Sequence, residues 1–342
     1  MTLGLLALQF LLCAALIAGA GYMLCQSADR IAKATGMTGG WMGLALLATV
    51  TSLPELASGI SAVTVIDAPN LAVGNALGAC VFNLFFLVVI DALQRRQPIY
   101  RHASAAHLLS AAFGVVMLGF VAMSLLLPKH APTLLHLGLY SPVLLAFYLL
   151  ALRSVFAHEQ ALRSVQPAAA APVSAEAMPQ ATPGLTHEWT RFGLAALVVL
   201  AAGSWLPSIA DQLAQVMGWS RSFVGTLFMA FVTTLPEIAV TLSALRLRAL
   251  DMAIGNLLGS NLFNVTILAI DDIFYTRGPL LADASPVHGG TAIAAVVMTG
   301  LVMIGLVMRP QGRELRVLSW VSAGLLATYL FNAALVFLYG GA

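Results

Sequence analysis

Apolar segments of membrane-spanning length follow one another along the whole chain. A helix needs about 20 mostly apolar residues to cross the hydrocarbon core of a bilayer. Segments of this kind lie near residues 3–25, 37–64, 70–91, 104–127, 133–152, 190–210, 219–245, 250–271, 287–308 and 314–339. The pattern therefore predicts an all-α integral membrane protein with ten transmembrane helices.

The composition agrees with this prediction. Of the 342 residues, 60% are hydrophobic and 9% are charged, whereas a soluble domain carries about 25% charged residues. The basic residues do not gather into one face, which excludes a nucleic-acid-binding surface. Cys13, Cys25 and Cys80 lack metal-ligand spacing and are interpreted as packing residues. No Lys or Arg precedes Arg30, so we expect the first apolar segment to be a span rather than a cleaved signal peptide.

The distribution of basic residues predicts the orientation of the chain. All but three of the 16 Lys and Arg residues lie in loops that follow odd-numbered spans, the exceptions being Lys129, Arg221 and Arg277. Basic loops are retained on the cytoplasmic side, so both termini are predicted to lie outside the plasma or inner membrane. Segment 153–189 is rich in Ala and Pro, which predicts a cytoplasmic linker between two five-span halves, 1–152 and 190–342.

The two halves repeat two motifs in the same order. Residues 51–55, Thr-Ser-Leu-Pro-Glu, return at 233–237 as Thr-Thr-Leu-Pro-Glu. Residues 74–83, Gly-Asn-Ala-Leu-Gly-Ala-Cys-Val-Phe-Asn, return at 255–264 as Gly-Asn-Leu-Leu-Gly-Ser-Asn-Leu-Phe-Asn. Because each half has an odd number of predicted spans, the second half would enter the membrane from the opposite side. Such inverted repeats are common in secondary transporters, whose sites lie near the midplane between the repeats.

Glu55 and Glu237 lie deep inside apolar spans, whereas we expect the other acidic residues, such as Asp91, to lie in loops or at helix ends. An acid at a helix centre costs roughly 2.5–3.5 kcal/mol on insertion scales and normally has a partner. No Lys or Arg lies at comparable depth. Two equivalent acids would meet near the pseudo-twofold axis and repel each other unless a cation lies between them. The alternative is a pair of protonated, hydrogen-bonded acids, but the repeat favours a transported cation.

The prolines that precede these glutamates leave backbone carbonyl oxygens free to act as ligands. A proline has no N–H group, so Pro54 and Pro236 free the carbonyls of Val50 and Val232. Hard cations such as Ca²⁺ take six to eight oxygen ligands, and the neighbouring Thr and Ser hydroxyls supply more. Glycine pairs in both halves let helices approach closely. Asn83 and Asn264, which end the second motif, could be further ligands or interhelical hydrogen-bonding groups, and both alternatives remain open.

These motifs resemble the α-repeats of the calcium/cation antiporter superfamily, the group that contains the sodium/calcium exchangers. The resemblance covers essentially the whole chain, with the motif regions at 48–83 and 230–264. It implies exchange of Ca²⁺ for Na⁺ by alternating access, with the first and sixth spans sliding across the core. It also implies a single cluster of metal ligands, namely Glu55, Glu237, Thr51, Thr233, Asn83, Asn264, Ser52, Thr234, Ser260, Ala48 and Ala230.

The chain departs from the family motifs at a few positions. Val50 and Val232 replace a glycine, and Ala79 replaces a serine whose hydroxyl Ser260 retains in the other half. Asn264 stands where potassium-dependent members have Asp, which argues against potassium transport. These changes leave the expected Ca²⁺ ligands in place but leave the counter-ion open between Na⁺ and H⁺. A passive cation channel is a more distant alternative. The chain has no motif of an intramembrane enzyme, and no cofactor is expected besides the transported ions.

Overall fold

The protein, described here from a computed structural model, is built almost entirely of helices. The structure describes residues 2–35, 47–94, 98–101, 103, 107–126, 133–165, 185–247, 249–310 and 318–341. Its longer helices are α1 (Leu3–Ala34), α3 (Leu53–Thr64), α4 (Pro69–Leu93), α5 (His107–Leu125), α6 (Tyr140–Val165), α7 (Leu185–Met217), α10 (Leu235–Arg246), α11 (Leu250–Phe274), α13 (Val287–Met308) and α14 (Trp320–Tyr339). Its short elements are η1 (Ile99–Arg101), β1 (Thr133–Leu134), β2 (Leu137–Gly138), α8 (Arg221–Phe223), the π-helix η3 (Val224–Met229), α9 (Ala230–Thr233) and α12 (Leu280–Asp283).

Within the described residues, eight helices are long and apolar enough to cross a membrane. A ninth span results if the bent pair formed by Arg221–Thr233 and α10 counts as one. The predicted second span begins at residue 37, and its first part lies outside the described residues. The all-α membrane class is therefore confirmed.

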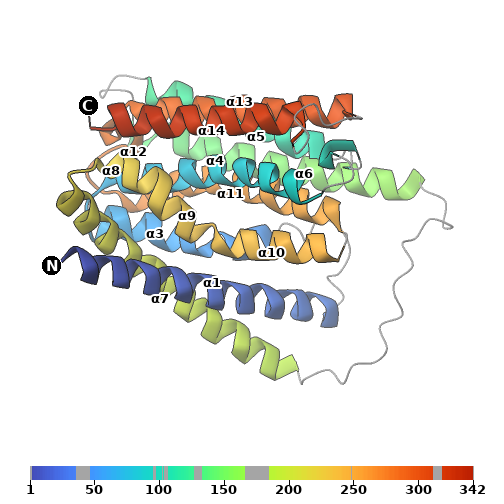
Figure 1. The fold of residues 1–342 in the computed structure, drawn as a ribbon, viewed down its shortest axis with the longest axis horizontal. Helices are drawn as coiled ribbons and strands as arrows, with labels where there is room; N and C mark the ends of the chain where they lie inside the picture. Colours follow the sequence, from blue (N-terminus) through green and yellow to red (C-terminus); the bar gives the residue numbers. More distant parts are fainter. Residues whose placement is uncertain are drawn as a thin grey trace.

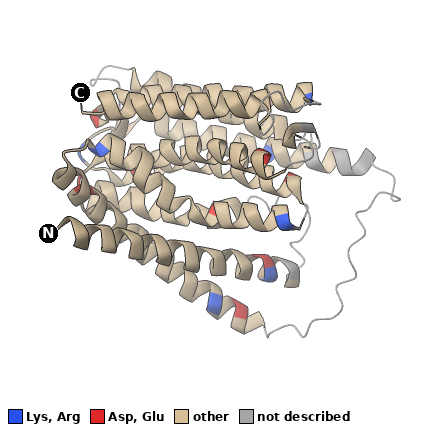
Figure 2. Ribbon diagram, in the orientation of Figure 1, with Lys and Arg blue, Asp and Glu red and all other residues tan. Residues whose placement is uncertain are grey.

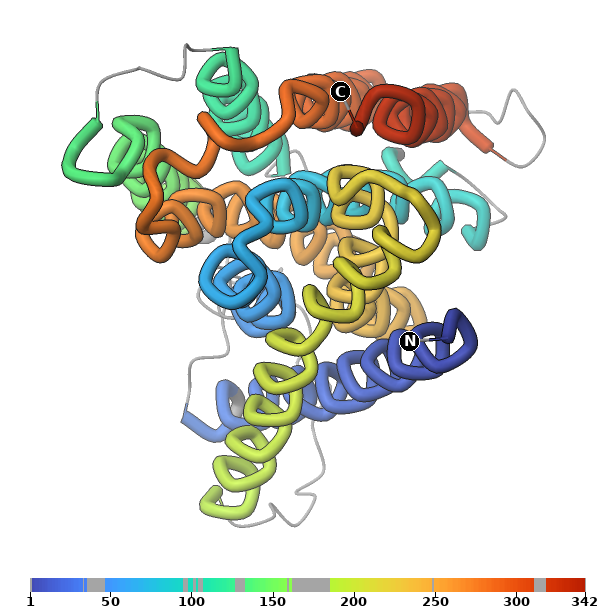
Figure 3. Tube along the Cα trace, turned by 90° about the vertical axis from the view of Figure 1, so that its left-hand side faces the viewer, coloured from blue at the N-terminus to red at the C-terminus, as the bar shows by residue number. Residues whose placement is uncertain are grey.

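The helices form three groups that run along a common direction (Figure 1). Helices α1 and α7 pack against each other at one side, and α5, α13 and α14 form the opposite side (Figure 3). Between them lie α3, α4, α10 and α11, of which α4 and α11 are the most buried of the long spans. The central helices carry the repeated motifs, so the fold places the motifs in the buried middle of the bundle.

Several predicted boundaries differ from the structure. The span predicted at 3–25 continues as α1 to Ala34, and α7 extends beyond both ends of the span predicted at 190–210. The span predicted at 133–152 begins at Tyr140, because residues 133–138 form the hairpin of β1 and β2 around Leu135, whose φ is 59°. The linker predicted at 153–189 is shorter than expected, because α6 continues to Val165 and α7 already begins at Leu185. The Arg, Ala, Leu, Glu and Gln residues of 153–163 are good helix formers. The middle of the linker, residues 166–184, lies outside the described residues.

Asp91 lies near the end of α4, as expected, but it is fully buried there. Its carboxylate accepts hydrogen bonds from the backbone N–H groups of Ile99 (3.1 Å) and Ser319 (3.0 Å). The hydroxyls of Ser319 (2.9 Å) and Ser322 (2.8 Å) also donate to it. Ser319 is the N-cap of α14, so an acid of the first half holds the start of the last helix of the second half.

Asp272, near the end of α11, makes the reciprocal arrangement and is also fully buried. The backbone N–H groups of Leu280 (2.7 Å) and Gly138 (2.9 Å) donate to its carboxylate. The hydroxyls of Tyr140 (2.6 Å) and Ser141 donate as well. Tyr140 and Ser141 lie at the start of α6, so an acid of the second half holds the last helix of the first half.

The two sets of contacts, which we term the crossed aspartate clamps, follow the internal repeat. The equivalent pairs all differ by the 181-residue offset of the second motif, and they are Asp91 and Asp272, Ile99 and Leu280, Gly138 and Ser319, and Ser141 and Ser322. A buried carboxylate needs such donors, because an unpaired buried charge is very costly. Most of the clamp hydrogen bonds cross between the halves, so the clamps tie each half to the other through contacts that neither half can make alone.

We expect Asp272→Ala to destabilise the protein by about 3 kcal/mol or more, because it leaves several buried donors without an acceptor. The measurement is thermal or denaturant unfolding of the full chain in detergent. Asp67→Asn is the matched control, since Asp67 forms a partly exposed ion pair with Arg277 (2.6 Å) that is expected to contribute at most about 1 kcal/mol. Equal stability of the two variants would contradict the role assigned to the clamps.

Candidate functional site

Both repeated Pro-Glu motifs lie where a helix is interrupted. The helical backbone, described from residue 47 onward, breaks at Ser52 (φ −89°, ψ 13°), and α3 starts at Leu53. Helix α9 breaks at Thr234 (φ −78°, ψ −1°) before α10, with a bend of 44° across the second break. Pro54 and Pro236 occupy the first positions of the new helices, where a missing N–H costs no helical hydrogen bond.

The breaks place Glu55 and Glu237 in the first turns of α3 and α10. Unpaired N–H groups and the helix dipole favour negative charge at this position. Both side chains are fully buried, and the two carboxyl groups are close enough to interact electrostatically. The structure thus brings the two predicted central residues together from different halves of the chain.

Each glutamate faces hydroxyl groups of the opposite half. Ser52 donates a hydrogen bond to Glu237 Oε1 at 2.9 Å, and Thr51 also lies beside this carboxylate. Thr233 and Thr234 lie beside Glu55. Ser260 joins this group, since its Oγ lies 3.3 Å from Thr51 Oγ1. All the predicted hydroxyl-bearing residues are therefore in one cluster.

The predicted backbone ligands Ala48 and Ala230 lie just before the two breaks. The Ala48 carbonyl accepts from Thr51 Oγ1 at 3.0 Å, and the Ala230 carbonyl accepts from Thr234 Oγ1 at 2.6 Å. A side chain at Gly259 would touch Ala48 (3.3 Å), and one at Gly78 would lie 2.8 Å from the Ala230 side chain. The small residues thus bring α4 and α11 against the interrupted helices.

Amide side chains extend the cluster. Asn83 donates to Asn261 Oδ1 at 3.0 Å, and Asn261 in turn donates to the Cys80 carbonyl at 3.2 Å. Asn75, which the sequence interpretation did not include, accepts a hydrogen bond from Thr233 at 3.1 Å. Its repeat equivalent, Asn256, is also fully buried. Their position in the repeated Gly-Asn dipeptide was a signal that could have identified both.

Several buried oxygen atoms of this cluster have no hydrogen-bond partner among the described residues. They are both carboxylate oxygens of Glu55, Oε2 of Glu237, and the amide oxygen of Asn83. The amide of Asn264 is also buried without a partner, but no hydrogen bond among the described residues joins it to this cluster. A buried polar group left unsatisfied costs about 1–3 kcal/mol, and more if it is charged. Within the described part of the chain, the ion pairs of Arg30, Arg221 and Arg277 are made with other acids. The protein therefore does not compensate the charge of this cluster with these side chains.

The donor set favours a hard cation. The described residues contain no group of three or more His, Cys, Asp or Glu side chains that could hold a metal ion. A cation here would depend on two carboxylates together with hydroxyl, amide and carbonyl oxygens. Hard cations prefer such oxygen donors, whereas Zn²⁺ sites use histidine and cysteine.

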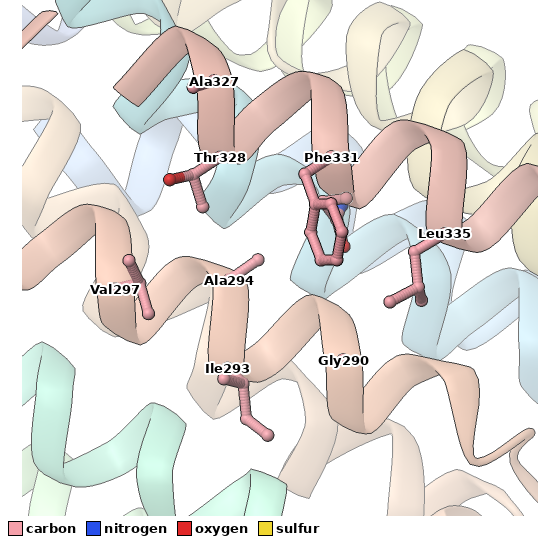
Figure 4. Close-up of a pocket in the computed structure, with 9 residues that line it drawn as sticks. Gly290, Ile293, Ala294, Val297, Ala327, Thr328, Phe331 and Leu335 are labelled. Atoms are coloured by element: carbon pink, nitrogen blue, oxygen red, sulfur yellow. The ribbon is translucent and has the colours of Figure 1, made fainter. Parts of the chain in front are cut away.

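An apolar groove elsewhere is separate from this cluster. It lies between α13 and α14 and is lined by residues such as Gly290, Ile293, Val297, Phe331 and Leu335 (Figure 4). Its lining includes neither glutamate. The oxygen cluster between the halves is therefore the candidate site.

Comparison with known proteins agrees with the geometry. Residues 5–156 and residues 187–338 each match the family model described as sodium/calcium exchanger protein. The inner membrane protein YrbG of Escherichia coli K12 is 26% identical, over 78% of this chain and 84% of its own length. The putative antiporter CaxA of Alkalimonas amylolytica is 28% identical, over 83% of this chain and 86% of its own length.

A solved structure shares the fold. The sodium-calcium exchanger NCX_Mj, soaked with Na⁺ and Ca²⁺, matches with a TM-score of 0.60 at 21% identity, over 98% of this chain and 99% of its own. The same family model thus matches both halves, and the relatives are matched over most of their length. On this evidence, the chain belongs to the sodium/calcium exchanger protein family.

Proposed function

We propose that this protein is a secondary active antiporter that exchanges Ca²⁺ for Na⁺ across the membrane by alternating access. The observation that carries the proposal is the buried pair of Glu55 and Glu237, whose carboxylates approach from opposite halves and retain oxygens without a partner. A cation bound between them would balance their charge and satisfy those oxygens. The relatives named as antiporters and exchangers support the same reading.

The proposed ligand set follows from the cluster. The glutamates are the central ligands, and the remaining members are Thr51, Thr233, Asn83, Asn264, Ser52, Thr234, Ser260, Ala48 and Ala230. Two carboxylates neutralise one divalent ion or attract several monovalent ions, so Ca²⁺ and Na⁺ compete for the same charge. An empty site with two negative charges resists moving across the membrane interior, and this resistance enforces exchange rather than leak.

The proposed architecture is ten spans in two inverted five-span halves. The duplicated family match and the offset of the crossed aspartate clamps support the repeat. The described basic residues gather mainly at one end of the molecule, which we assign to the cytoplasm, with both termini outside (Figure 2). Helices α1 and α7 are the proposed sliding elements, and they are joined by the ion pair of Arg30 and Glu188 (2.8 Å).

Proton coupling is the second candidate. Ala79, which is fully buried, replaces a hydroxyl-bearing residue of the family motif, so the site has one oxygen fewer for Na⁺. A proton needs only a carboxylate oxygen, and this loss would not weaken proton binding. The same glutamates would then accept protons in place of sodium ions.

Flux measurements on the purified protein in proteoliposomes test the proposal and separate the two candidates. We expect Ca²⁺ uptake when a Na⁺ gradient is directed out of the vesicles at equal pH on both sides. Uptake driven by a pH gradient in the absence of Na⁺ would select proton coupling instead. A K⁺ gradient, the control, is expected to drive no uptake. Ca²⁺ movement that ignores every imposed gradient would contradict antiport and indicate a passive channel.

A further inference from the structure

A third buried acid, Asp271, lies outside the proposed ligand set. It is on α11, is fully buried, and neither of its carboxylate oxygens has a hydrogen-bond partner among the described residues. Its neighbour Asp272 differs completely, because the clamp contacts satisfy that carboxylate. An isolated ionised carboxylate in an apolar interior is very costly. The side chain therefore needs either a bound cation or a proton.

Asp271 packs against the helix that carries Glu55. A side chain at Gly59 of α3 would lie 2.6 Å from Asp271 Oδ1 and even closer to Oδ2. Glycine at this position therefore leaves the space that the carboxyl group occupies. Gly59 follows Glu55 by four residues, which places both on the same face of α3 at a separation of about 6 Å along the helix axis.

The same contact places Asp271 between the ion site and one end of the molecule. Helix α3 ends at Thr64 and α11 ends at Phe274. The loops that follow these ends meet in the ion pair of Asp67 and Arg277 (2.6 Å). Asp271 thus lies about one turn beyond Glu55 and about one turn inside the end of α11. A proton that enters or leaves from this end would meet Asp271 before it meets the glutamates.

The charges around Asp271 do not supply a counter-ion. Asp272 is the group that acts on it electrostatically, and it is itself an acid. Helix α11 packs against α3, α4, α5, α6, α10, α12 and β2. Their titratable groups in the described residues include the acids Glu55, Asp91, Glu237 and Asp283, the phenols Tyr140 and Tyr148, and the basic groups His107, Arg153, His158 and Arg246. Beyond the end of α11, Tyr275 donates to Asp283 and His136 bonds the Ile273 carbonyl.

The basic groups are placed away from Asp271. His107 pairs with Asp251 at the start of α11, the end opposite to Asp271. Arg246 ends α10 just before that same start. Arg153 lies about three turns along α6 from the clamp residues at its beginning. Among the described residues, Asp271 lacks the neighbouring hydroxyl groups that lie beside Glu55. A bound proton therefore suits Asp271 better than a metal ion.

The acid is also present in only one half. By the 181-residue offset, the equivalent of Asp271 is Ile90. The offset of the first motif makes Thr241 the equivalent of Gly59. The glycine that leaves space and the acid that fills it are therefore paired only once, between the glutamates and the end of the molecule that holds Asp67 and Arg277.

We propose that Asp271 is a proton-binding residue whose protonation lowers the affinity of the Glu55–Glu237 site for cations. This inference rests on the proposed antiport function. In the charged form, the carboxylate adds negative potential near the site. A proton from water at the Asp67–Arg277 end binds by forming an O–H bond with the carboxylate, and the negative charge of Asp271 is then lost. Release of the proton breaks this O–H bond and returns the proton to water. At an effective dielectric constant of ~20, a unit charge about two turns away changes the affinity for a monovalent ion by roughly tenfold and that for a divalent ion by roughly a hundredfold.

The first test detects the proton itself. Infrared spectra of the full-length protein in lipid should show a protonated-carboxyl band that shifts in D₂O and is lost in Asp271→Asn. Asp67→Asn, which changes an acid at the same end of the molecule, should keep the band. A spectrum that is the same for the wild type and Asp271→Asn would overturn the proposal. This readout does not require transport, so it stands even if the antiport function is wrong.

The second test measures the consequence for transport. The apparent Ca²⁺ affinity of the wild type in proteoliposomes should fall about a hundredfold as the pH is lowered through the titration of Asp271. Asp271→Asn should show the low affinity at every pH, because asparagine imitates the neutral acid. Asp271→Glu should restore the pH response. An unchanged pH profile in Asp271→Asn would overturn the proposal, whereas absence of any gradient-driven Ca²⁺ flux in the wild type would contradict the proposed function alone.

Discussion

Glu55→Gln is expected to abolish Ca²⁺ exchange, and Glu237→Gln should do the same. Each change removes one of two buried charges that face each other from opposite halves. Loss of one partner from a buried charge pair typically costs about 3–5 kcal/mol, and the carboxylates and a bound Ca²⁺ form such a set. This corresponds to a loss of roughly 10²–10³-fold or more in ion affinity. The measurement is ⁴⁵Ca²⁺ uptake into proteoliposomes under an imposed Na⁺ gradient.

Stability measurements distinguish this loss from misfolding. In the absence of Ca²⁺, both glutamine variants should be as stable as the wild type or more stable, because an uncompensated buried charge is removed. They should lose the stabilisation that Ca²⁺ gives the wild type through binding to the folded state. Asp67→Asn is the matched control, since Asp67 pairs with Arg277 in a partly exposed ion pair away from the cluster. Normal exchange in Glu55→Gln would refute the proposed site.

Gly78→Val is expected to produce the second largest loss, through geometry rather than charge. A side chain at Gly78 would collide with the Thr226 carbonyl oxygen of η3 and would lie 2.8 Å from the Ala230 side chain. Backbone on both sides cannot give way cheaply, so we expect a cost near the upper end of the 1–3 kcal/mol range for overpacking, or about 3 kcal/mol. The added side chain would push Ala230 and the helix break at Thr234 out of position. The exchange rate should therefore fall by at least about tenfold.

Gly119→Val on α5 is the matched control for this prediction. No heavy atom lies within 4 Å of a side chain added at Gly119, so the same chemical change meets open space. Its exchange rate and unfolding temperature should match those of the wild type. If Gly78→Val transported Ca²⁺ as well as Gly119→Val does, the close contact between α4 and η3 would have no role in forming the site.

Much of the site could be predicted from the sequence, because its chemistry is local and duplicated. Glu55 and Glu237 stand out as acids in long apolar segments, and the Pro-Glu motif marks the helix breaks beside them. The repeat then predicts that the two motifs meet in the fold, although the sequence contains no information on the distance between them. Their approach in the structure confirms that pairing, while the role of each residue as an ion ligand stays a prediction.

The burial of the aspartates could not be predicted in the same way. Asp91 is followed closely by Arg95 and Arg96 in the sequence, which indicated a helix end but gave no sign of burial. Its actual partners, Ser319 and Ser322, come from the far end of the chain. Likewise, the space for Asp271 is made by a glycine of another helix. Contacts of this kind depend on tertiary packing and leave no pattern in the neighbouring residues.

The crossed aspartate clamps also constrain how the protein is made. The hydroxyl donors at the start of α6 have no acceptor until Asp272 has been synthesised, more than a hundred residues later. The N-terminal half therefore inserts with these groups unsatisfied and can complete its tertiary structure only after the C-terminal half emerges. Two separately encoded fragments, divided within residues 166–184, should accordingly be degraded when expressed singly and should assemble when expressed together in one cell.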